Sequence, residues 1–142
     1  MTRIQFAQKA VITDGDKVLL VRKSSDDPHN PCRWELPGGR LKDTEGLDDH
    51  VKREVLEETG LFVRPGRLIH MWSWEMLWDG EPVRVVAVSR YCDLESWESI
   101  APAREKDDFI DDQMWVARSD LLSMDIVPSQ ISTVEFVASD TL

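Results

Sequence analysis

Four charged residues fall within little more than one helical turn near the middle of the chain: Arg53, Glu54, Glu57 and Glu58. At about 100° per residue the three carboxylates share one side of a helix, and Glu54 and Glu58 point within about 40° of the apolar Leu47 and Val51, respectively. An unpaired carboxylate that faces a protein interior is costly, so a cation is expected beside this face. Hard carboxylate oxygens without thiolates or clustered imidazoles favour Mg²⁺ or Mn²⁺ over zinc. The spacing therefore predicts a divalent metal site.

The sequence around this cluster resembles the signature of the Nudix hydrolases, G-x5-E-x7-R-E-U-x-E-E-x-G-U, where U is a bulky aliphatic residue. Each defined position is matched in the required order, by Gly39, Glu45, Arg53, Glu54, Val55, Glu57, Glu58, Gly60 and Leu61. The preceding segment Trp34–Gly38 also looks like the strand and turn that lead into the signature in many members. The rest of the chain matches the family only in length and general pattern. An isolated E-x-x-E-E string is usually a solvated helix face, but the complete signature favours a metal site.

The resemblance implies a hydrolase that depends on a divalent metal ion. By this resemblance Glu57 and Glu58 are metal ligands, and Glu54 is either a ligand or the base that activates water. The carbonyl of Gly38 would complete the metal's coordination.

The resemblance also implies supporting roles around the metal site. Arg53 would orient the neighbouring carboxylates, including Glu45, because its planar guanidinium can donate several charge-assisted hydrogen bonds at once. Gly39 and Gly60 fall on signature positions, where they would form turns and shape the site.

Length and composition limit the class of protein. A chain of 142 residues with 42% apolar content is the size of one domain with a single core, expected over residues 1–142. Cys32 and Cys92 lack any C-x-x-C spacing, so neither a disulfide framework nor a zinc knuckle is indicated. The net charge of −10 disfavours nucleic-acid polymers and anionic membranes. With no targeting or membrane-spanning pattern, a cytoplasmic protein is expected.

Hydrophobic periodicity and turn residues predict the order of the elements. Strands are expected over residues 4–13, 17–22, 34–36, 67–78, 82–91 and 114–117. Helices are expected over Leu47–Thr59, with Gly60 as its stop, and over Pro128–Ala138. Turns are expected at Pro37–Gly39 and Asp79–Gly80, and the acid-rich segment 95–112 is expected to be a mobile loop. This pattern predicts an α/β (α+β) fold, and the resemblance specifies a mixed sheet sandwiched between helices.

Aromatic residues alternate along the segment 67–78, so they would project from one face of a strand. They are His70, Trp72, Trp74, Met76 and Trp78. Such a face could stack a nucleobase, or it could pack in the core or in a homodimer interface. Packing is favoured for most of these residues, and stacking by one of them stays open. Both alternatives therefore enter the functional hypothesis.

Some Nudix members take a further carboxylate from a loop beyond the signature, as base or metal ligand. This chain offers Glu105, Asp107, Asp108, Asp111 and Asp112 in such a place. Arg22, Arg40 and Arg84 are candidates for phosphate or base contacts.

The sequence thus predicts a Mg²⁺- or Mn²⁺-dependent enzyme that cleaves a diphosphate linkage in a small nucleotide substrate. Nucleoside triphosphates are the expected class. A sugar-nucleotide or dinucleotide pyrophosphatase is an alternative, and so is a non-catalytic nucleotide sensor on the same fold. The residues near Trp78 carry neither the proline typical of ADP-ribose hydrolases nor the tyrosine of dinucleoside polyphosphate hydrolases.

Overall fold

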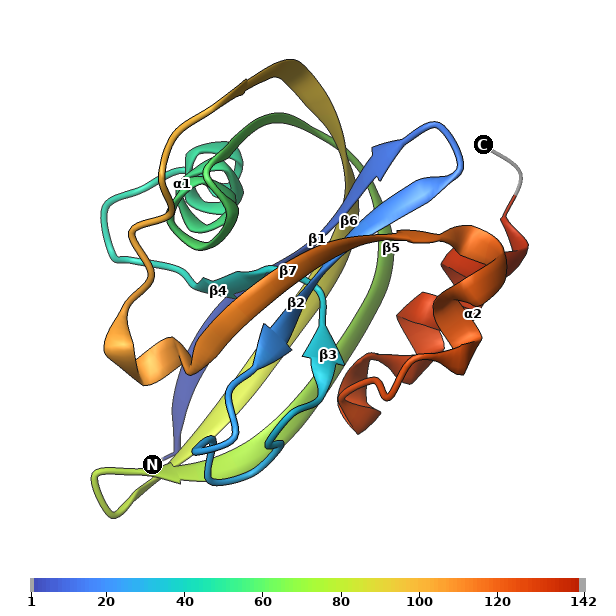
Figure 1. Cartoon of the computed structure of the whole chain (residues 1–142). Coiled ribbons are helices and arrows are strands. Elements are labelled where there is room, and N and C mark those ends of the chain that lie inside the picture. The colour runs from blue at the N-terminus through green and yellow to red at the C-terminus, as the bar shows by residue number, and fades with distance from the viewer. Residues whose placement is uncertain (1, 141–142) are drawn as a thin grey trace.

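The protein forms a large mixed sheet with helices on both sides, in a computed structural model that describes residues 2–140 (Figure 1). Within these residues the sheet has 7 strands, with β3, β2, β1, β6 and β5 side by side in this order. The remaining two strands extend it, because β4 pairs with β1 and β7 pairs with β2. The predicted fold class is confirmed.

The two N-terminal strands form the predicted hairpin. β1 (Arg3–Asp14) and β2 (Lys17–Lys23) pair antiparallel only beside their turn, at Thr13↔Val18 and Asp14↔Lys17. The rest of β1 runs parallel to β6 (Glu81–Ser99) and is antiparallel to the short β4 (Gly38–Arg40). β1 is therefore the central strand of the sheet, and it pairs with β2, β4 and β6.

The glycines before the helix are extended, which corrects the expected Pro37–Gly39 turn. β3 (Trp34–Glu35) ends before a bend at Pro37, and Gly38 and Gly39 then belong to β4. At Gly38, with φ of 149°, a side-chain carbon would overlap the carbonyl oxygen of Gln8. Only glycine allows β4 to approach β1 this closely.

The long hairpin of β5 (Leu61–Trp78) and β6 turns at Asp79–Gly80, as predicted. Both turn residues have positive φ, 50° and 78°, which suits an Asp-Gly hairpin turn. β5 begins before the expected residue 67, because register shifts between Leu61 and His70 absorb Pro65.

The segment 95–112 is more regular than the expected mobile loop. β6 continues to Ser99, a 3₁₀ helix spans Lys106–Asp108, and β7 (Ile110–Ala117) begins four residues before the predicted 114. These elements depend on partners far away in sequence, because Ser99 pairs with Leu61 and Ile110 with Lys23. Local periodicity could not show those pairings.

The two helices lie where the sequence places them. α1 (Leu47–Thr59) has the predicted bounds, and Gly60 ends it in the left-handed conformation, with φ of 76°. α2 (Ile131–Ser139) follows a 3₁₀ turn at Pro128–Gln130. The sequence predicts an apolar side of Ile131, Val134 and Val137, of which Val134 and Val137 are buried and Ile131 is 41% exposed. Another 3₁₀ helix, Arg118–Ser123, lies between β7 and α2.

The core lies on both faces of the sheet. On one face Val51 and Val55 of α1 pack on a cluster that includes Ile12 of β1. On the other face Val134 and Val137 of α2 belong to a cluster that includes Val11. Neighbouring β1 residues thus serve opposite layers. Among residues 2–140, no helix has both the length and the apolar character needed to cross a membrane.

Candidate active site

A cleft of about 370 Å³ lies between α1, β4 and the segment before β7. It brings together most of the predicted site residues: Gly38, Gly39, Arg53, Glu54, Glu58, Trp78, Glu105, Asp107 and Asp108. Glu57 does not line the cleft, but its carboxylate accepts a hydrogen bond from Arg53, which does. The predicted residues therefore converge on one region.

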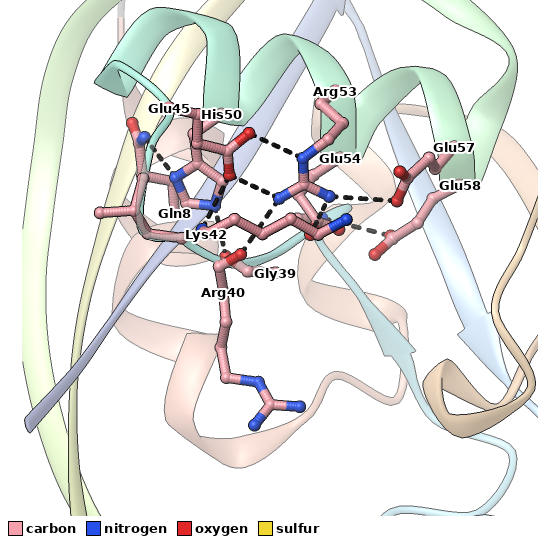
Figure 2. A network of polar contacts seen from close by, with 12 residues as sticks. Gln8, Gly39, Arg40, Lys42, Glu45, His50, Arg53, Glu54, Glu57 and Glu58 are labelled. Atoms are coloured by element: carbon pink, nitrogen blue, oxygen red, sulfur yellow. Dashed lines mark hydrogen bonds and ion pairs between the residues drawn. The ribbon is translucent and has the colours of Figure 1, made fainter. Parts of the chain in front are cut away.

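Arg53 is the centre of the polar network in this region (Figure 2). Its Nε and Nη2 donate to both carboxylate oxygens of Glu45, at 2.8 and 2.7 Å. Its Nη1 donates to Glu54 at 2.9 Å and to Glu57 at 3.2 Å, and Nη2 also donates to the Arg40 carbonyl at 3.2 Å. Only a guanidinium can make this set of bonds, since a lysine has no planar fork.

The bidentate pair with Arg53 dominates the charge state of Glu45. Hydrogen bonds from Arg53 lower the pKa of Glu45 from 4.5 to about 2, against an opposing effect of burial. The same bonds raise the pKa of Arg53, which stays charged. The pair therefore keeps both Glu45 and Arg53 ionised.

Two of the acids are buried, as the helical spacing predicts. Glu54 is 8% exposed and Glu58 is 1% exposed. Burial raises the pKa of Glu54, although Arg53 opposes it, and burial raises the pKa of Glu58 well above its usual value, although Lys9 opposes it. Carboxylates in this setting favour a nearby cation.

The helix holds each residue of β4 in turn. The Gly38 N–H donates to the Glu58 carboxylate at 3.2 Å, and the ring of His50 donates to the Gly39 carbonyl at 2.9 Å. At Gly39 a side-chain carbon would lie 2.5 Å from a carboxylate oxygen of Glu54. A side chain at this position would therefore displace the Glu54 carboxylate.

The chemistry of the donor set fits a hard divalent ion. The candidate ligands Glu54, Glu57, Glu58 and the Gly38 carbonyl all offer oxygen, which Mg²⁺ and Mn²⁺ prefer. Within residues 2–140, no three acidic, histidine or cysteine side chains converge as they would around an ion. Instead the Arg53 guanidinium is bound to both Glu54 and Glu57. Each of these two carboxylates keeps one oxygen that is not bound to Arg53.

Sequence reasoning missed Lys9 and Lys23, two largely buried lysines that line the cleft. Lys9 lies 3.6 Å and Lys23 3.4 Å from the same Glu35 carboxylate, and all three side chains are largely buried. Lys9 also donates to the Gly38 carbonyl at 3.5 Å. Burial lowers the pKa of Lys9, but Glu35 and the other cleft acids raise it by more. Lys9 lies directly before the apolar run Ala10–Ile12 of β1, and a lysine in that place was the available signal.

The acidic segment reaches the cleft at some of the predicted positions. Glu105, Asp107 and Asp108 line it, and burial raises the pKa of Asp108. Asp111 instead pairs with Arg22 at 3.0 Å, and neither Asp111 nor Asp112 lines the cleft.

The aromatic face divides between packing and the cleft. Trp72, Met76 and Trp78 pack on the apolar cluster of Ala7, Val83, Val85 and Ala87, whereas Trp74 is 37% exposed. Of these, Trp78 lines the cleft, and the Arg40 guanidinium lies 3.4 Å from its ring centroid. Among residues 2–140, the buried Nε1 of Trp72 has no hydrogen-bond partner.

Comparison with known proteins gives consistent relatives. The NUDIX domain model matches residues 4–135. The 8-oxo-dGTP diphosphatase of Escherichia coli K12 is 27% identical over 95 residues, which cover 58% of this chain and 73% of the relative. The phosphatase NudJ of the same strain is 32% identical over 89 residues, 63% of this chain and 54% of NudJ. This chain thus spans about half of NudJ.

Solved structures agree on the fold. The MutT protein from Methanosarcina mazei Go1 superposes with a TM-score of 0.74 at 24% identity, and the match covers 96% of this chain and 94% of that one. Such low identity supports the fold alone. The NUDIX domain model, however, extends from β1 into α2 and includes the helix and strand that form the cleft. The protein therefore belongs to the Nudix hydrolase family.

Proposed function

We propose that this Nudix hydrolase uses Mg²⁺ or Mn²⁺ to cleave a diphosphate linkage in a nucleoside diphosphate derivative, with nucleoside triphosphates as the main substrates. The observation that carries the proposal is the pair of buried carboxylates, Glu54 and Glu58, at the wall of a cleft that also contains the largely buried Lys9 and Lys23. Water would attack phosphorus, and a nucleoside monophosphate and pyrophosphate would leave.

The metal would be held by Glu57, Glu58, the Gly38 carbonyl and, in one of its two possible roles, Glu54. Nudix hydrolases in general use divalent metal ions. The ion would neutralise charge on the phosphate oxygens and on the attacking water. Arg53 would keep Glu54 and Glu57 in place while they act, since it donates to both carboxylates.

Glu54 is the first candidate for the base that accepts a proton from water. Its carboxylate lines the cleft, and burial raises its pKa towards the range in which a carboxylate is an effective base. Glu105, Asp107 and Asp108 are the alternatives from the segment before β7, since they also line the cleft.

The cleft can accept an anionic substrate although the whole chain carries a charge of −10. Lys9 and Lys23 are set inside it, where low solvent access strengthens their attraction for phosphate. Both also approach Glu35, and Lys23 lies 3.6 Å from Asp27, so a substrate phosphate would compete with Glu35 for both ammonium groups and with Asp27 for one of them. This arrangement favours binding of the phosphates at the β1 and β2 side of the cleft.

Arg40 and Trp78 would bind the rest of the substrate. Among residues 2–140, the Arg40 guanidinium has no hydrogen bond or ion pair, and its contact is the ring of Trp78. Its donors thus remain available for a base edge or a distal phosphate. The same two residues line a neighbouring cleft of about 540 Å³, beside Arg3 and Phe6. That second cleft favours the alternative of a longer substrate, a sugar nucleotide or a dinucleotide.

A product analysis tests the proposal. The protein would be incubated with Mg²⁺ and a panel of nucleoside triphosphates, sugar nucleotides and dinucleotides, and the products separated by anion-exchange chromatography. Triphosphates are expected to give monophosphate and pyrophosphate. Faster cleavage of sugar nucleotides or dinucleotides would select the alternative. No turnover of any compound, with nucleotide binding retained, would identify a sensor instead of an enzyme.

A further inference from the structure

His50 is a fully buried histidine under β4 for which the proposed reaction gives no role. It lies in the first turn of α1 and is 0% exposed. Its Nδ1 is 2.8 Å from the amide nitrogen of Gln8, and its Nε2 is 2.9 Å from the carbonyl oxygen of Gly39 (Figure 2). Both ring nitrogens therefore have a partner.

The contacts of Gln8 determine which nitrogen of His50 carries the proton. The Gln8 amide nitrogen donates to the Leu47 carbonyl at 2.8 Å, and its amide oxygen accepts from Arg90 at 3.4 Å. The amide therefore cannot be reversed without losing both bonds. The same nitrogen faces His50, so the histidine Nδ1 must accept. A proton on Nε2 then donates to Gly39.

The surroundings of the ring also favour the neutral form. A protonated imidazole would need acceptors at both nitrogens, and the amide group of Gln8 presents a donor. The N-terminal turn of α1 adds a positive dipole end. Burial lowers the pKa of His50, which is the same direction. The structure thus contains a neutral histidine with one fixed tautomer.

The hydrogen bond to Gly39 acts where β4 is closely packed against its neighbours. Gly39 lies between Gln8 of β1 and the carboxylate of Glu54. The neighbouring Gly38 N–H is bound to Glu58, and its carbonyl faces Lys9 in the cleft. A shift of the Gly39 carbonyl would therefore move both the candidate metal-binding carbonyl and the strand against Glu54.

We propose that His50 is a positioning residue of the active site: its Nε2–H tautomer, fixed by Gln8, holds the Gly39 carbonyl and so keeps the Gly38–Gly39 backbone beside Glu54 and Glu58. The inference rests on the proposed metal site but assigns a residue outside it. His50 does not line the cleft and would touch neither metal nor substrate. The alternative is a histidine that only fills space between α1 and β1.

Two matched variants separate these alternatives. In His50→Gln the side-chain amide extends to about the position of Nε2, so it can still donate to Gly39. In His50→Asn the shorter amide corresponds to Nδ1, so it can meet Gln8 but not Gly39. Both replace a buried ring by a smaller polar side chain, and both should lower the melting temperature. If His50 only fills space, His50→Asn should lose at least as much stability as His50→Gln. Neither variant should then change metal binding.

The first measurement is Mn²⁺ affinity, from electron paramagnetic resonance of the free ion, together with kcat and KM. We expect His50→Asn to weaken Mn²⁺ binding by about tenfold or more and to reduce kcat more than it raises KM, as for other outer groups that orient metal ligands. His50→Gln should stay within about threefold of the wild-type affinity. Wild-type Mn²⁺ affinity in both folded variants, or equal losses in both, would overturn the proposal.

A second measurement needs no variant. Nitrogen chemical shifts of the imidazole in the metal-free wild-type protein should show His50 with a protonated Nε2 and an unprotonated Nδ1. The opposite tautomer or an imidazolium at neutral pH would overturn the proposal even if the variants did not fold. If the wild-type protein showed no metal-dependent turnover, the proposed function would fail, whereas the tautomer and the Mn²⁺ affinities would still decide the role of His50.

Discussion

Arg104 donates a hydrogen bond from Nε to the carbonyl oxygen of Glu58, at 2.9 Å. A helix leaves its last carbonyls without partners, and here side chains from beyond β6 supply them. Arg104 also donates to Gln113 at 2.8 Å, which in turn donates to the Thr59 carbonyl at 3.3 Å. The end of α1 that carries the metal-ligand candidates is thereby tied to the segment that carries the cleft acids.

Removing this link should loosen the acidic segment. Arg104→Met keeps much of the aliphatic stem but loses both hydrogen bonds, so amides of residues 100–108 should exchange faster with solvent. Turnover should fall, but by less than in Glu57→Gln. Hydrogen exchange read by mass spectrometry checks this, with the exposed Arg64→Met as control. Unchanged exchange in the segment would show that other contacts hold it.

Glu58→Gln should stabilise the metal-free protein while removing its response to metal. Burial raises the pKa of Glu58 in the folded state, so the folded protein holds this proton more tightly than the unfolded chain. Stability therefore falls as the pH rises from the unfolded pKa towards the folded one. A neutral amide avoids this loss and can still accept from Gly38.

Thermal unfolding at pH 8 checks the prediction, with a chelator and with excess Mg²⁺. The wild-type melting temperature should rise with Mg²⁺, because the ion binds only the folded state. Glu58→Gln should melt higher than wild type in the chelator, gain nothing from Mg²⁺, and turn over at least about a hundredfold more slowly. Glu57→Gln is the comparison, since its side chain is 26% exposed and should lose the Mg²⁺ response without the stabilisation.

Arg53→Lys should reduce activity. It should also make the free energy of unfolding depend less strongly on pH in the acidic range. The pKa of Glu45 is lowered to about 2 in the folded protein, chiefly by hydrogen bonds from Arg53. Its contribution is therefore present above the unfolded pKa of 4.5 and is lost as the pH falls towards 2. An ammonium cannot hold both oxygens of Glu45 and the other acids together.

Melting temperatures between pH 6 and pH 2 give the readout for this variant. The difference between wild type and Arg53→Lys should shrink as the pH falls, because protonated Glu45 gains little from either cation. A constant difference across this range, with normal turnover, would show that Arg53 acts only as a general surface cation.

The helix could be predicted from sequence because its information is local. Val51 and Val55 recur at helical spacing, Gly60 marks the end, and the acids follow the same period. The parts that were missed depend on distant partners. His50 looks like one more polar residue in a polar stretch, and Gln8, which fixes its tautomer, is 42 residues away. Lys9 likewise becomes a cleft residue only when β1 pairs with β4.

The sequence does not decide between stacking and packing for the aromatic face, for the same reason. Alternation shows that the tryptophans of β5 share a face but not how far the cleft extends along it. Trp72→Leu should lower the melting temperature and leave KM nearly unchanged, because Trp72 packs on the apolar cluster. Trp78→Leu should raise KM, because its ring lines the cleft beside Arg40. The more exposed Trp74→Leu is the control, and an equal effect of all three on KM would contradict this division.

The identity of the base and of the attacked atom can be tested together. If Glu54 accepts a proton from the attacking water, its carboxylate must be ionised, so activity should rise with pH through the raised pKa of Glu54. Glu54→Gln should remove most activity and this pH dependence. Among Glu105→Gln, Asp107→Asn and Asp108→Asn, at most one should cause a severe loss of activity.

Hydrolysis in ¹⁸O-labelled water should place the label on a phosphate product, as attack at phosphorus requires. Label on a sugar carbon, or full activity in a chelator, would contradict the metal-assisted reaction, and a pH profile that persists in Glu54→Gln would transfer the role of base to the acidic segment.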